Sequence, residues 1–363
     1  RQALFMAQRC RLCFGDRLES FDSKHLKNWY DCRLTKKINI MKIIRWGILG
    51  LGKIANSFAT DLQQVEGSVL YAVASRSQEK ADHFGAEYNA TQCYNSYEQL
   101  VKDPNVDAVY IATPHVRHHQ DTLLCLQHKK AVLCEKPFAM NREQVEEMIT
   151  TAQANDTLLM EALWTRFMPH FKFVQQELES GRYGTVKTLT ADFCFEAEFN
   201  PEGRLFNKAL GGGSLLDIGI YPIFCALALF GKPDHIEAKA KIGKTGVDEE
   251  TEMTFKYNSG ISAFLSSSIL KKTPTTATLV CEKGMLILNS RFHQTDKVTT
   301  ILEGTKIEHD FAYTGKGYYF EIEHFAELLR QEKKESPLMN YAFSRLLIST
   351  LDEVRELINL QYA

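Results

Sequence analysis

The chain divides into two regions that differ in the spacing of their hydrophobic residues. Up to about residue 161, short apolar runs alternate with segments in which apolar residues recur at helical spacing. The apolar runs occupy residues 43–49, 69–74, 107–112, 131–134 and 158–160. Continuous apolar strands that alternate with helices are typical of a parallel, doubly wound α/β sheet. The sequence therefore predicts such a domain over residues 41–161.

Beyond residue 161, hydrophobic and polar residues alternate with a period of two. This pattern covers residues 189–195, 236–242, 251–257, 261–268, 276–281 and 286–289. Half-buried strands joined by short turns predict an open, mainly antiparallel sheet, so we assign residues 162–363 to an α+β substrate domain. Helices beginning at Ser214, near Tyr318 and at Ala342 should cover one face of this sheet. The other face also needs a cover, which predicts a homodimer formed through the sheet.

Residues 1–40 show no clear period and precede the first strand. They carry nine Lys and Arg residues against four Asp and Glu, whereas the whole chain has a formal net charge of -2. We interpret them as a disordered extension that ends before Met41 and lies outside the fold. A targeting presequence is one alternative. Another is a zinc site, for which the loosely spaced ligands would be Cys10, Cys13, His25 and Cys32.

Composition narrows the class of protein. The 363 residues are 44% hydrophobic and 24% charged, which is typical of a globular chain large enough for two cores. No apolar run reaches ~18 residues, so no membrane span is expected. Nine scattered cysteines suggest reduced thiols in a cytoplasmic protein, and the absence of a basic stripe argues against a nucleic-acid partner.

A glycine-rich turn follows the first strand. Gly50-Leu-Gly52-Lys53-Ile54-Ala55 is a G-x-G-x-x-A motif, and helical spacing begins directly after it. Strand, glycine turn and helix in this order open a dinucleotide-binding Rossmann unit. Gly50 would make the tight turn, Gly52 would let the backbone approach a pyrophosphate, and Ala55 would let helix and strand pack closely. The helix would present free N–H groups to the phosphates. An ordinary βα turn is the alternative.

The second strand is followed by Ser75-Arg76, ~20 residues after the glycine turn, where an Asp or Glu would hold the ribose hydroxyls of NAD. Neither acid is present. Ser75 can instead hydrogen-bond a 2′-phosphate, and Arg76 can pair with that phosphate or stack on adenine. We therefore favour NADP as the cofactor, with NAD possible. Alternatively, Arg76 is only a solvated residue after a strand.

Further polar residues follow the third and fourth strands, at the edge where a doubly wound sheet binds ligands. The residues assigned to the cofactor site there are Thr113, Pro114, His115, Glu135 and Lys136. A proline after Lys136 favours extended backbone, which would aim the lysine side chain outward. The histidines at positions 115, 118 and 119 lack a convincing set of carboxylate or thiolate partners. We therefore predict that they contact substrate or cofactor and that no metal is bound, with a structural role as the alternative for any single one of them.

A second glycine segment, Gly211-Gly-Gly-Ser214-Leu-Leu-Asp217-Ile-Gly-Ile-Tyr221, opens a helix in the second region. Its glycines can bend tightly against a ligand, and Ser214 can cap the helix. Asp217 and Tyr221 are four residues apart, so they would share one helical face. A carboxylate and a phenol presented together could handle a substrate hydroxyl. A capped helix with a core tyrosine is the alternative.

Three motifs in this order resemble the Gfo/Idh/MocA family of NAD(P)-dependent oxidoreductases. They are the glycine turn at Gly50–Ala55, the Glu135-Lys136-Pro137 strand end, and the segment from Gly211 to Tyr221. Residues 160–167, 215–221 and 245–249 further resemble the dimeric dihydrodiol dehydrogenase and NADP-linked D-xylose dehydrogenase branch of that family. The resemblance extends over most of the chain after Met41.

The resemblance implies a mechanism and a substrate class. Lys136 matches the family's active-site lysine, Asp217 its substrate-orienting carboxylate, and Tyr221 the acid/base of the dihydrodiol branch. Tyr221, with its pKa lowered by Lys136, would take a proton from a substrate hydroxyl while hydride moves to the nicotinamide. The substrate would be a sugar, a polyol or a trans-dihydrodiol. Further contacts to the nicotinamide and the substrate are implied for Trp164, Arg166 and His118.

Two rival functions are weighed against this one, because a fold does not determine a function. A non-catalytic NAD(P)-responsive regulatory protein would not need Lys136, Asp217 and Tyr221 together. A redox-neutral NAD-dependent glycosidase would be expected to carry an acidic ribose partner in place of Ser75-Arg76. Both observations favour the dehydrogenase, but neither identifies its substrate.

Overall fold

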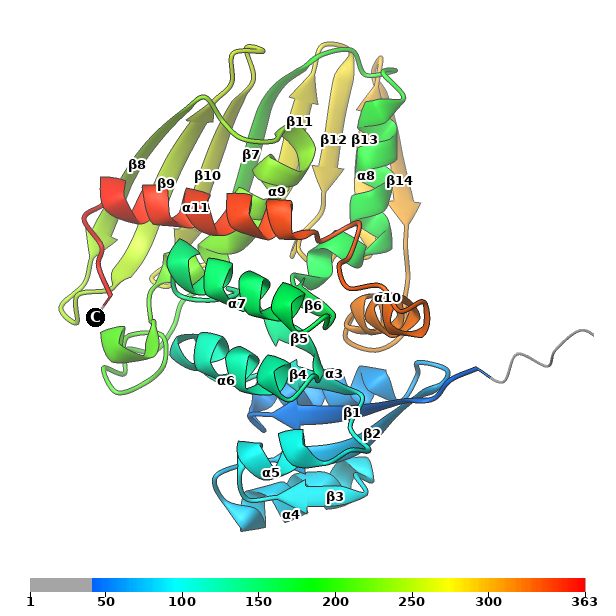
Figure 1. Ribbon diagram of the computed structural model, residues 1–363. Helices are drawn as coiled ribbons and strands as arrows, with labels where there is room; N and C mark the ends of the chain where they lie inside the picture. The colour runs from blue at the N-terminus through cyan, green and yellow to red at the C-terminus, as the bar shows by residue number, and fades with distance from the viewer. Residues whose placement is uncertain (1–40, 363) are drawn as a thin grey trace, which may run out of the picture. The chain divides into compact units, whose positions relative to one another are not determined.

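The computed structural model describes residues 41–362. Within this range the chain forms a six-stranded sheet and an eight-stranded sheet, each with helices packed against it (Figure 1). This architecture confirms the predicted α/β class, with a parallel sheet followed by an open, mainly antiparallel one. The predictions made for residues 1–40, including the zinc site, lie outside the described residues.

The first sheet is parallel throughout and has the strand order β3-β2-β1-β4-β5-β6. Its strands are β1 (Ile44–Leu49), β2 (Ser68–Ala74), β3 (Gln92–Tyr94), β4 (Ala108–Ile111), β5 (Ala131–Glu135) and β6 (Leu159–Ala162). The helices that follow its strands are α3 (Lys53–Leu62), α4 (Gln78–Tyr88), α5 (Tyr97–Lys102), α6 (His115–Gln127) and α7 (Arg142–Ala154). The strand order reverses between β1 and β4, which is the point where doubly wound sheets bind ligands.

Side-chain caps begin three of these helices. Ser77 accepts a hydrogen bond from the Lys80 N–H at the start of α4, and Ser96 accepts one from Gln99 at the start of α5. The side-chain oxygen of Asn141 accepts one from the Gln144 N–H at the start of α7. Each of these caps is local, because the capping side chain and the N–H group that it binds are three residues apart in the sequence.

The second sheet has the order β14-β13-β12-β11-β7-β10-β9-β8. Its strands are β7 (Val186–Cys194), β8 (His235–Ile242), β9 (Asp248–Lys256), β10 (Ser262–Ser268), β11 (Ala277–Cys281), β12 (Gly284–Leu288), β13 (Lys297–Leu302) and β14 (Thr305–Asp310). All neighbours are antiparallel except β7 and β10, which run parallel in the middle of the sheet. One face is covered by α8 (Pro169–Glu179), α9 (Ile220–Phe230) and α11 (Tyr341–Leu357) (Figure 1).

Helix α10 (Tyr319–Arg330) does not cover the second sheet, contrary to the sequence prediction. It packs against α3, and its Phe325 ring lies 5.2 Å from the ring of Trp46 in β1. Asp61 at the end of α3 accepts hydrogen bonds from the N–H groups of Lys316 and Tyr318, which hold the start of α10. Apolar spacing shows that a helix has a buried face but not which sheet buries it. Helix α10, which lies far beyond residue 161 in the sequence, therefore completes the core of the first sheet. A domain boundary at residue 161 stays a prediction.

One segment among the described residues, Lys208–Phe230, is long and apolar enough to cross a membrane. Its most apolar window has a mean hydropathy of 1.8, but 83% of that window is buried inside the protein. Such a test is also passed by core helices of water-soluble proteins, and α9 packs between the second sheet and α11. This segment is therefore weak evidence for a membrane span.

Candidate active site

A cavity of about 930 Å³ lies at the carboxyl ends of the first-sheet strands and extends to the start of α9 and the loop between β12 and β13. It brings together most of the residues that the sequence assigned to cofactor and substrate. They are Gly50, Gly52, Lys53, Ile54, Ser75, Arg76, Thr113, Pro114, His115, His118, Glu135, Lys136, Trp164, Asp217 and Tyr221. Among the predicted site residues, only Ala55 and Arg166 do not line it. Ala55 is fully buried, in keeping with its expected packing role.

The glycine turn between β1 and α3 fits a pyrophosphate. Gly50 has a φ of +85°, and a Cβ added there would lie 2.8 Å from the backbone of Ala112 and Thr113. Gly52 differs, because a Cβ added there would meet nothing within 4 Å. Gly52 precedes α3, whose first turn has no side-chain cap and no acidic residue. The free N–H groups and the dipole of α3 therefore face open space suited to an anion.

The ribose end of the cavity carries positive charge. Ser75 and Arg76 line it as predicted, and Lys80 from the first turn of α4 lines it as well. Lys80 belongs to no motif and was not predicted, although its position three residues after the capping Ser77 places it beside the same turn. A smaller hollow of about 390 Å³ adjoins this region and includes Arg76, Tyr97 and Arg117.

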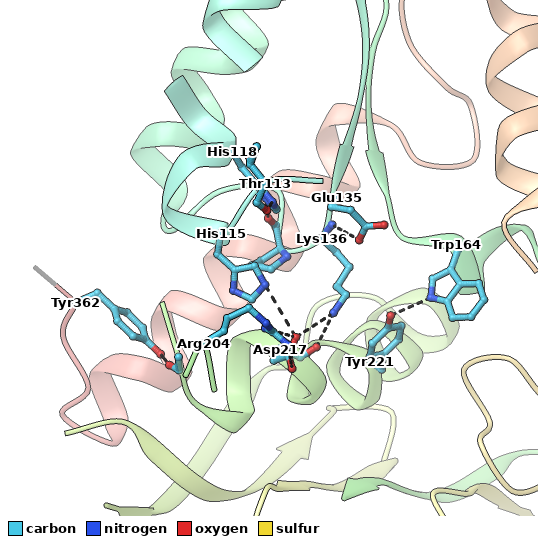
Figure 2. A network of polar contacts seen from close by, with 12 residues as sticks. Thr113, His115, His118, Glu135, Lys136, Trp164, Arg204, Asp217, Tyr221 and Tyr362 are labelled. Carbon is cyan, nitrogen blue, oxygen red and sulfur yellow. Dashed lines mark hydrogen bonds and ion pairs between the residues drawn. The ribbon is translucent and has the colours of Figure 1, made fainter. Parts of the chain in front are cut away.

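Lys136 and Asp217 meet at the other end of the cavity (Figure 2). Lys136 Nζ donates a 2.7 Å hydrogen bond to the main-chain carbonyl of Asp217 and lies 3.5 Å from Asp217 Oδ1. Arg204, from the loop after β7, holds the same carboxylate with two contacts of 2.9 and 3.0 Å. Burial disfavours the charged carboxylate, but Lys136 and Arg204 outweigh it and hold the pKa of Asp217 well below its usual range. Asp217 is therefore ionised at neutral pH.

Tyr221 is buried next to this pair, and its hydroxyl accepts a 2.9 Å hydrogen bond from Trp164 Nε1 (Figure 2). Lys136 Nζ lies 5.0 Å from the centre of the Tyr221 ring, over the ring face. Burial, followed by the charge of Glu135, raises the pKa of Tyr221 well above 10. The predicted lowering of this pKa by Lys136 is wrong, because burial and the charge of Glu135 raise it, while Lys136 Nζ bonds to Asp217.

The segment that carries Asp217 is a π-helix, η3 (Leu215–Gly219), and α9 begins only after it. Ser214 does not cap this helix, contrary to the prediction; its hydroxyl instead donates to Asp248 Oδ2 at 2.8 Å. The same Asp248 oxygen accepts from the Leu215 N–H at 2.7 Å. The cap therefore comes from β9, which local sequence could not indicate. Asp217 and Tyr221 still point into one cavity, and π-helical turns are frequent at functional sites.

The histidines at the start of α6 have different surroundings. His115 lines the cavity with Nε2 4.0 Å from Asp217 Oδ1, and burial lowers its pKa to about 3, so its imidazole is neutral. His118 is fully buried, and its two ring nitrogens contact the main-chain oxygens of Pro137 and Thr113 at 2.8 and 2.9 Å. The proposed substrate contact of His118 is therefore replaced by a structural one, which ties the Lys136 turn to the end of β4.

Arg166 and Trp164 lie in the 3₁₀-helix η1 (Trp164–Phe167) but face different surroundings. Trp164 lines the cavity as expected. Arg166 Nε instead donates to the main-chain oxygen of Leu338 at 3.0 Å, and its guanidinium lies 5.8 Å from the ring centre of Phe343. The predicted contact of Arg166 with the nicotinamide is wrong, because the turn of η1 points its side chain toward α11.

Several residues of the second region line the same end of the cavity as Tyr221 and were not predicted. Besides Arg204, these are the aromatic side chains of Phe193, His293 and Tyr318, all of which line the cavity. Alternation along β7 indicated that Phe193 points inward, but no local signal connects it to Tyr221. Within residues 41–362, no group of three or more His, Cys, Asp or Glu side chains could hold a metal ion.

A turn that fits a pyrophosphate thus shares one cavity with a lysine, an ionised carboxylate and a tyrosine. That combination defines an NAD(P)-dependent oxidoreductase, in which the cofactor supplies the redox chemistry and the protein positions the substrate. The chain belongs to the Gfo/Idh/MocA family. Residues 44–163 match the model described as "Oxidoreductase family, NAD-binding Rossmann fold", and residues 171–287 match the "GFO/IDH/MocA C-terminal domain".

Relatives of known name are similar over nearly their whole length. Trans-1,2-dihydrobenzene-1,2-diol dehydrogenase of Mus musculus is 37% identical over 331 residues, covering 88% of this chain and 98% of the relative. The human protein of the same name is 35% identical, with the same coverage.

Solved structures support the fold. An aldose-aldose oxidoreductase from Caulobacter crescentus, complexed with glycerol, superposes with a TM-score of 0.80 at 23% identity, covering 88% of this chain and 98% of that one. A 3-ketoreductase from Actinomadura kijaniata, in complex with NADP and TDP-benzene, superposes with a TM-score of 0.78 at 25% identity, covering 86% and 97%.

Proposed function

We propose that this oxidoreductase prefers NADP and transfers hydride between the cofactor and a hydroxyl-bearing carbon of a sugar, a polyol or a trans-dihydrodiol. The observation that carries the proposal is the convergence of Lys136, Asp217 and Tyr221 in the cavity that the glycine turn opens into. The name of the 37% identical mouse relative supports a dihydrodiol as one substrate. The second region, which would bind the substrate, supplies Asp217 and Tyr221.

The chain's own residues would donate or accept the proton, while the nicotinamide of the bound cofactor accepts or supplies hydride. The raised pKa of Tyr221 keeps its hydroxyl protonated at neutral pH, so it can donate a proton to a carbonyl oxygen as a general acid. Lys136 places a positive charge next to that oxygen, where negative charge develops. Asp217, held by Arg204, can accept a hydrogen bond from a second substrate hydroxyl. In the oxidising direction Tyr221 must first lose its own proton to solvent before it can take one from the substrate hydroxyl, so alkaline pH should favour oxidation.

The preference for NADP rests on the charge at the ribose end of the cavity. Ser75 offers a hydroxyl, while Arg76 and Lys80 offer cations for a 2′-phosphate. The test is the ratio of kcat/KM for NADP to that for NAD with one substrate. A ratio below one would contradict the preference without affecting the assignment as a dehydrogenase.

The decisive experiment incubates the purified chain with NADP and a panel of aldoses, polyols and trans-dihydrodiols, and follows the absorbance of NADPH. Steady accumulation of NADPH with one of these classes supports the proposal. Release of sugar from glycosides without net NADPH would instead identify a redox-neutral glycosidase. Ligand binding with neither reaction would identify an NAD(P)-responsive regulatory protein.

We also propose that the chain forms a homodimer through the uncovered face of the second sheet. On β10, Ala263 and Leu265 are buried beneath the helices, whereas Phe264 between them is 46% exposed on the other face. Val280 on β11 is exposed on that face as well. Light scattering of the purified protein should give the mass of a dimer, and Phe264→Lys should lower it to that of one chain. A monomeric wild-type protein would contradict the proposal.

A cytoplasmic location is proposed for a separate reason. The six cysteines between residues 41 and 362 are all unpaired, which is typical of a reducing compartment. Cell fractionation followed by immunodetection tests this, and recovery of the protein from a secreted or membrane fraction would contradict it.

A further inference from the structure

The loop between β12 and β13 carries a histidine whose backbone is fixed from both sides. Thr165 in η1 donates a 2.7 Å hydrogen bond from its hydroxyl to the main-chain oxygen of His293. His170 in α8 donates one of 2.9 Å to the main-chain oxygen of Phe292, the preceding residue. The next residue, Gln294, accepts from the hydroxyl of Tyr313 at 2.7 Å. These contacts hold three consecutive peptide units, so the position of the His293 side chain is built into the fold.

The imidazole of His293 lies against the catalytic tyrosine. It stacks on Phe193 with ring centres 4.3 Å apart and an interplanar angle of 16°. Its ring centre lies 5.1 Å from that of Tyr221 and 6.0 Å from that of Trp164. His293 lines the cavity but is only 5% exposed. Stacking fixes the plane of the imidazole ring. The two ring nitrogens lie on its edge, where they can form directional hydrogen bonds.

At least one ring nitrogen of His293 is left without a partner by the described part of the chain. Nδ1 is buried and has no hydrogen-bond partner among residues 41–362. Burial, with help from the charges of Arg291 and Lys136, lowers the pKa of His293 well below 6.5, so the ring is neutral. A neutral imidazole has one N–H donor and one acceptor. We assign the proton to Nε2, because an unpaired buried N–H on Nδ1 would cost more free energy than an unpaired acceptor there.

Besides Lys136 and His115, three polar positions surround the place where a substrate would react. One is the hydroxyl of Tyr221, the second is the Asp217 carboxylate with Arg204, and the third is His293. A trans-dihydrodiol has two hydroxyl groups and would leave one of these positions unpaired. An aldose or a polyol has at least three oxygens on neighbouring carbons and can satisfy all of them. A binding site discriminates against a ligand that leaves one of the buried polar groups of the site without a hydrogen-bond partner.

We propose that His293 is a substrate-binding residue that donates a hydrogen bond from Nε2 to an oxygen of a polyhydroxylated substrate. By this contact it sets a preference for aldoses and polyols over aromatic dihydrodiols. The inference rests on the proposed function, because it assigns the substrate class of the same cavity. It adds a residue that comes from a different element than Lys136, Asp217 or Tyr221.

Three substitutions at this position separate hydrogen bonding from packing. His293→Phe keeps an aromatic ring for stacking on Phe193 but removes both nitrogens. His293→Gln places an amide N–H near the position of Nε2, whereas His293→Asn places it near Nδ1. Because Gln and Asn are both polar and non-aromatic, they serve as matched controls for each other. Circular dichroism and thermal unfolding would confirm that each variant is folded.

The measurement is the ratio of kcat/KM for D-xylose to kcat/KM for a trans-dihydrodiol, with NADP as cofactor. We expect His293→Phe to lower this ratio about ten-fold, through a higher KM for the aldose, because one neutral hydrogen bond is lost. His293→Gln should restore most of the ratio and His293→Asn should not. An unchanged ratio in His293→Phe would overturn the inference while leaving the proposed function intact.

A binding measurement decides the case in which turnover fails. If the wild-type protein reduces no NADP with any substrate, the proposed function falls. Binding of D-xylose to the protein loaded with NADPH can still be followed by calorimetry. Weaker binding to His293→Phe than to His293→Gln would then support the inference, and absent or equal binding would overturn it.

Discussion

The two ends of the cavity are built in different ways. At the phosphate end, Gly50, Gly52 and the first turn of α3 present main-chain groups from six consecutive residues. At the reacting end, Lys136, Arg204 and Tyr221 come from separate elements and are held by side chains from still others. A site made of backbone is specified by local sequence, whereas a site made of converging side chains depends on the whole fold. The following predictions test whether the two ends can be disabled independently.

The largest effect is expected for Tyr221→Phe. Removing the hydroxyl removes the proton donor. General acid–base catalysis typically contributes about 10²–10⁴-fold, so turnover should fall by about that factor. The phosphate end is untouched, so the dissociation constant for NADPH, measured by fluorescence, should stay within about two-fold, far less than one buried polar contact contributes. Turnover close to that of the wild-type protein would remove Tyr221 from the mechanism. A large loss of NADPH affinity would show that the two ends are not independent.

The opposite end is disabled by Gly50→Ala. A Cβ at φ +85° would lie 2.8 Å from the backbone of Ala112 and Thr113, so the turn must move. Strain of about 1–3 kcal/mol should weaken NADPH binding roughly ten- to hundred-fold and lower the melting temperature. Gly52→Ala is the matched control, because its Cβ meets no protein atom within 4 Å. It should lose NADPH affinity but keep its melting temperature. Equal melting temperatures for both variants would contradict the role assigned to Gly50.

A smaller effect is expected at the ribose end. Arg76→Ala removes one of two cations near the predicted 2′-phosphate, so affinity for NADPH should fall about ten-fold while affinity for NADH changes little. Lys80→Ala provides the comparison, with a change in the same direction. Equal losses for the two cofactors would mean that Arg76 stacks on the adenine and does not contact the phosphate.

The contrast between the two ends also explains what could be predicted from the sequence. The glycine turn and the parallel, doubly wound sheet follow from patterns of residues close together in the sequence, and both were predicted. The cap of η3 by Asp248 joins residues 33 positions apart, and it was missed.

Errors in the predicted roles share this cause. Arg166 and Trp164 are near neighbours in sequence, but the fold gives their side chains different partners. Arg166 bonds to Leu338, whereas Trp164 bonds to Tyr221. His118 is close to the cavity, yet two main-chain oxygens occupy its nitrogens. The raised pKa of Tyr221 follows from burial, which no motif reports. The resemblance identified which residues matter, and the fold determined what each one touches.

The smallest predicted effect concerns the support beneath the reacting end. Glu161 in β6 accepts hydrogen bonds from the Phe138 N–H at 3.2 Å and from the Ser344 hydroxyl at 2.8 Å. It thereby joins the turn after Lys136 to α11, and its partner Ser344 lies 183 residues further along the chain. Burial raises the pKa of Glu161 to about 7, above the ordinary value of 4.5. The folded protein therefore holds this proton more tightly than the unfolded chain does.

Stability must then fall as the pH rises from about 4.5 through about 7, and should become constant above that range. Between pH 6 and pH 8 this group should contribute a loss of about 1 kcal/mol. Glu161→Gln keeps the shape and removes the titration, so the difference in free energy of unfolding between these two pH values should shrink by that amount. Urea denaturation at both pH values measures it. If the difference in free energy of unfolding were undiminished in the variant, the turn after Lys136 would not depend on this long-range contact. That result would weaken the contrast between a phosphate end specified by local sequence and a reacting end that depends on the whole fold.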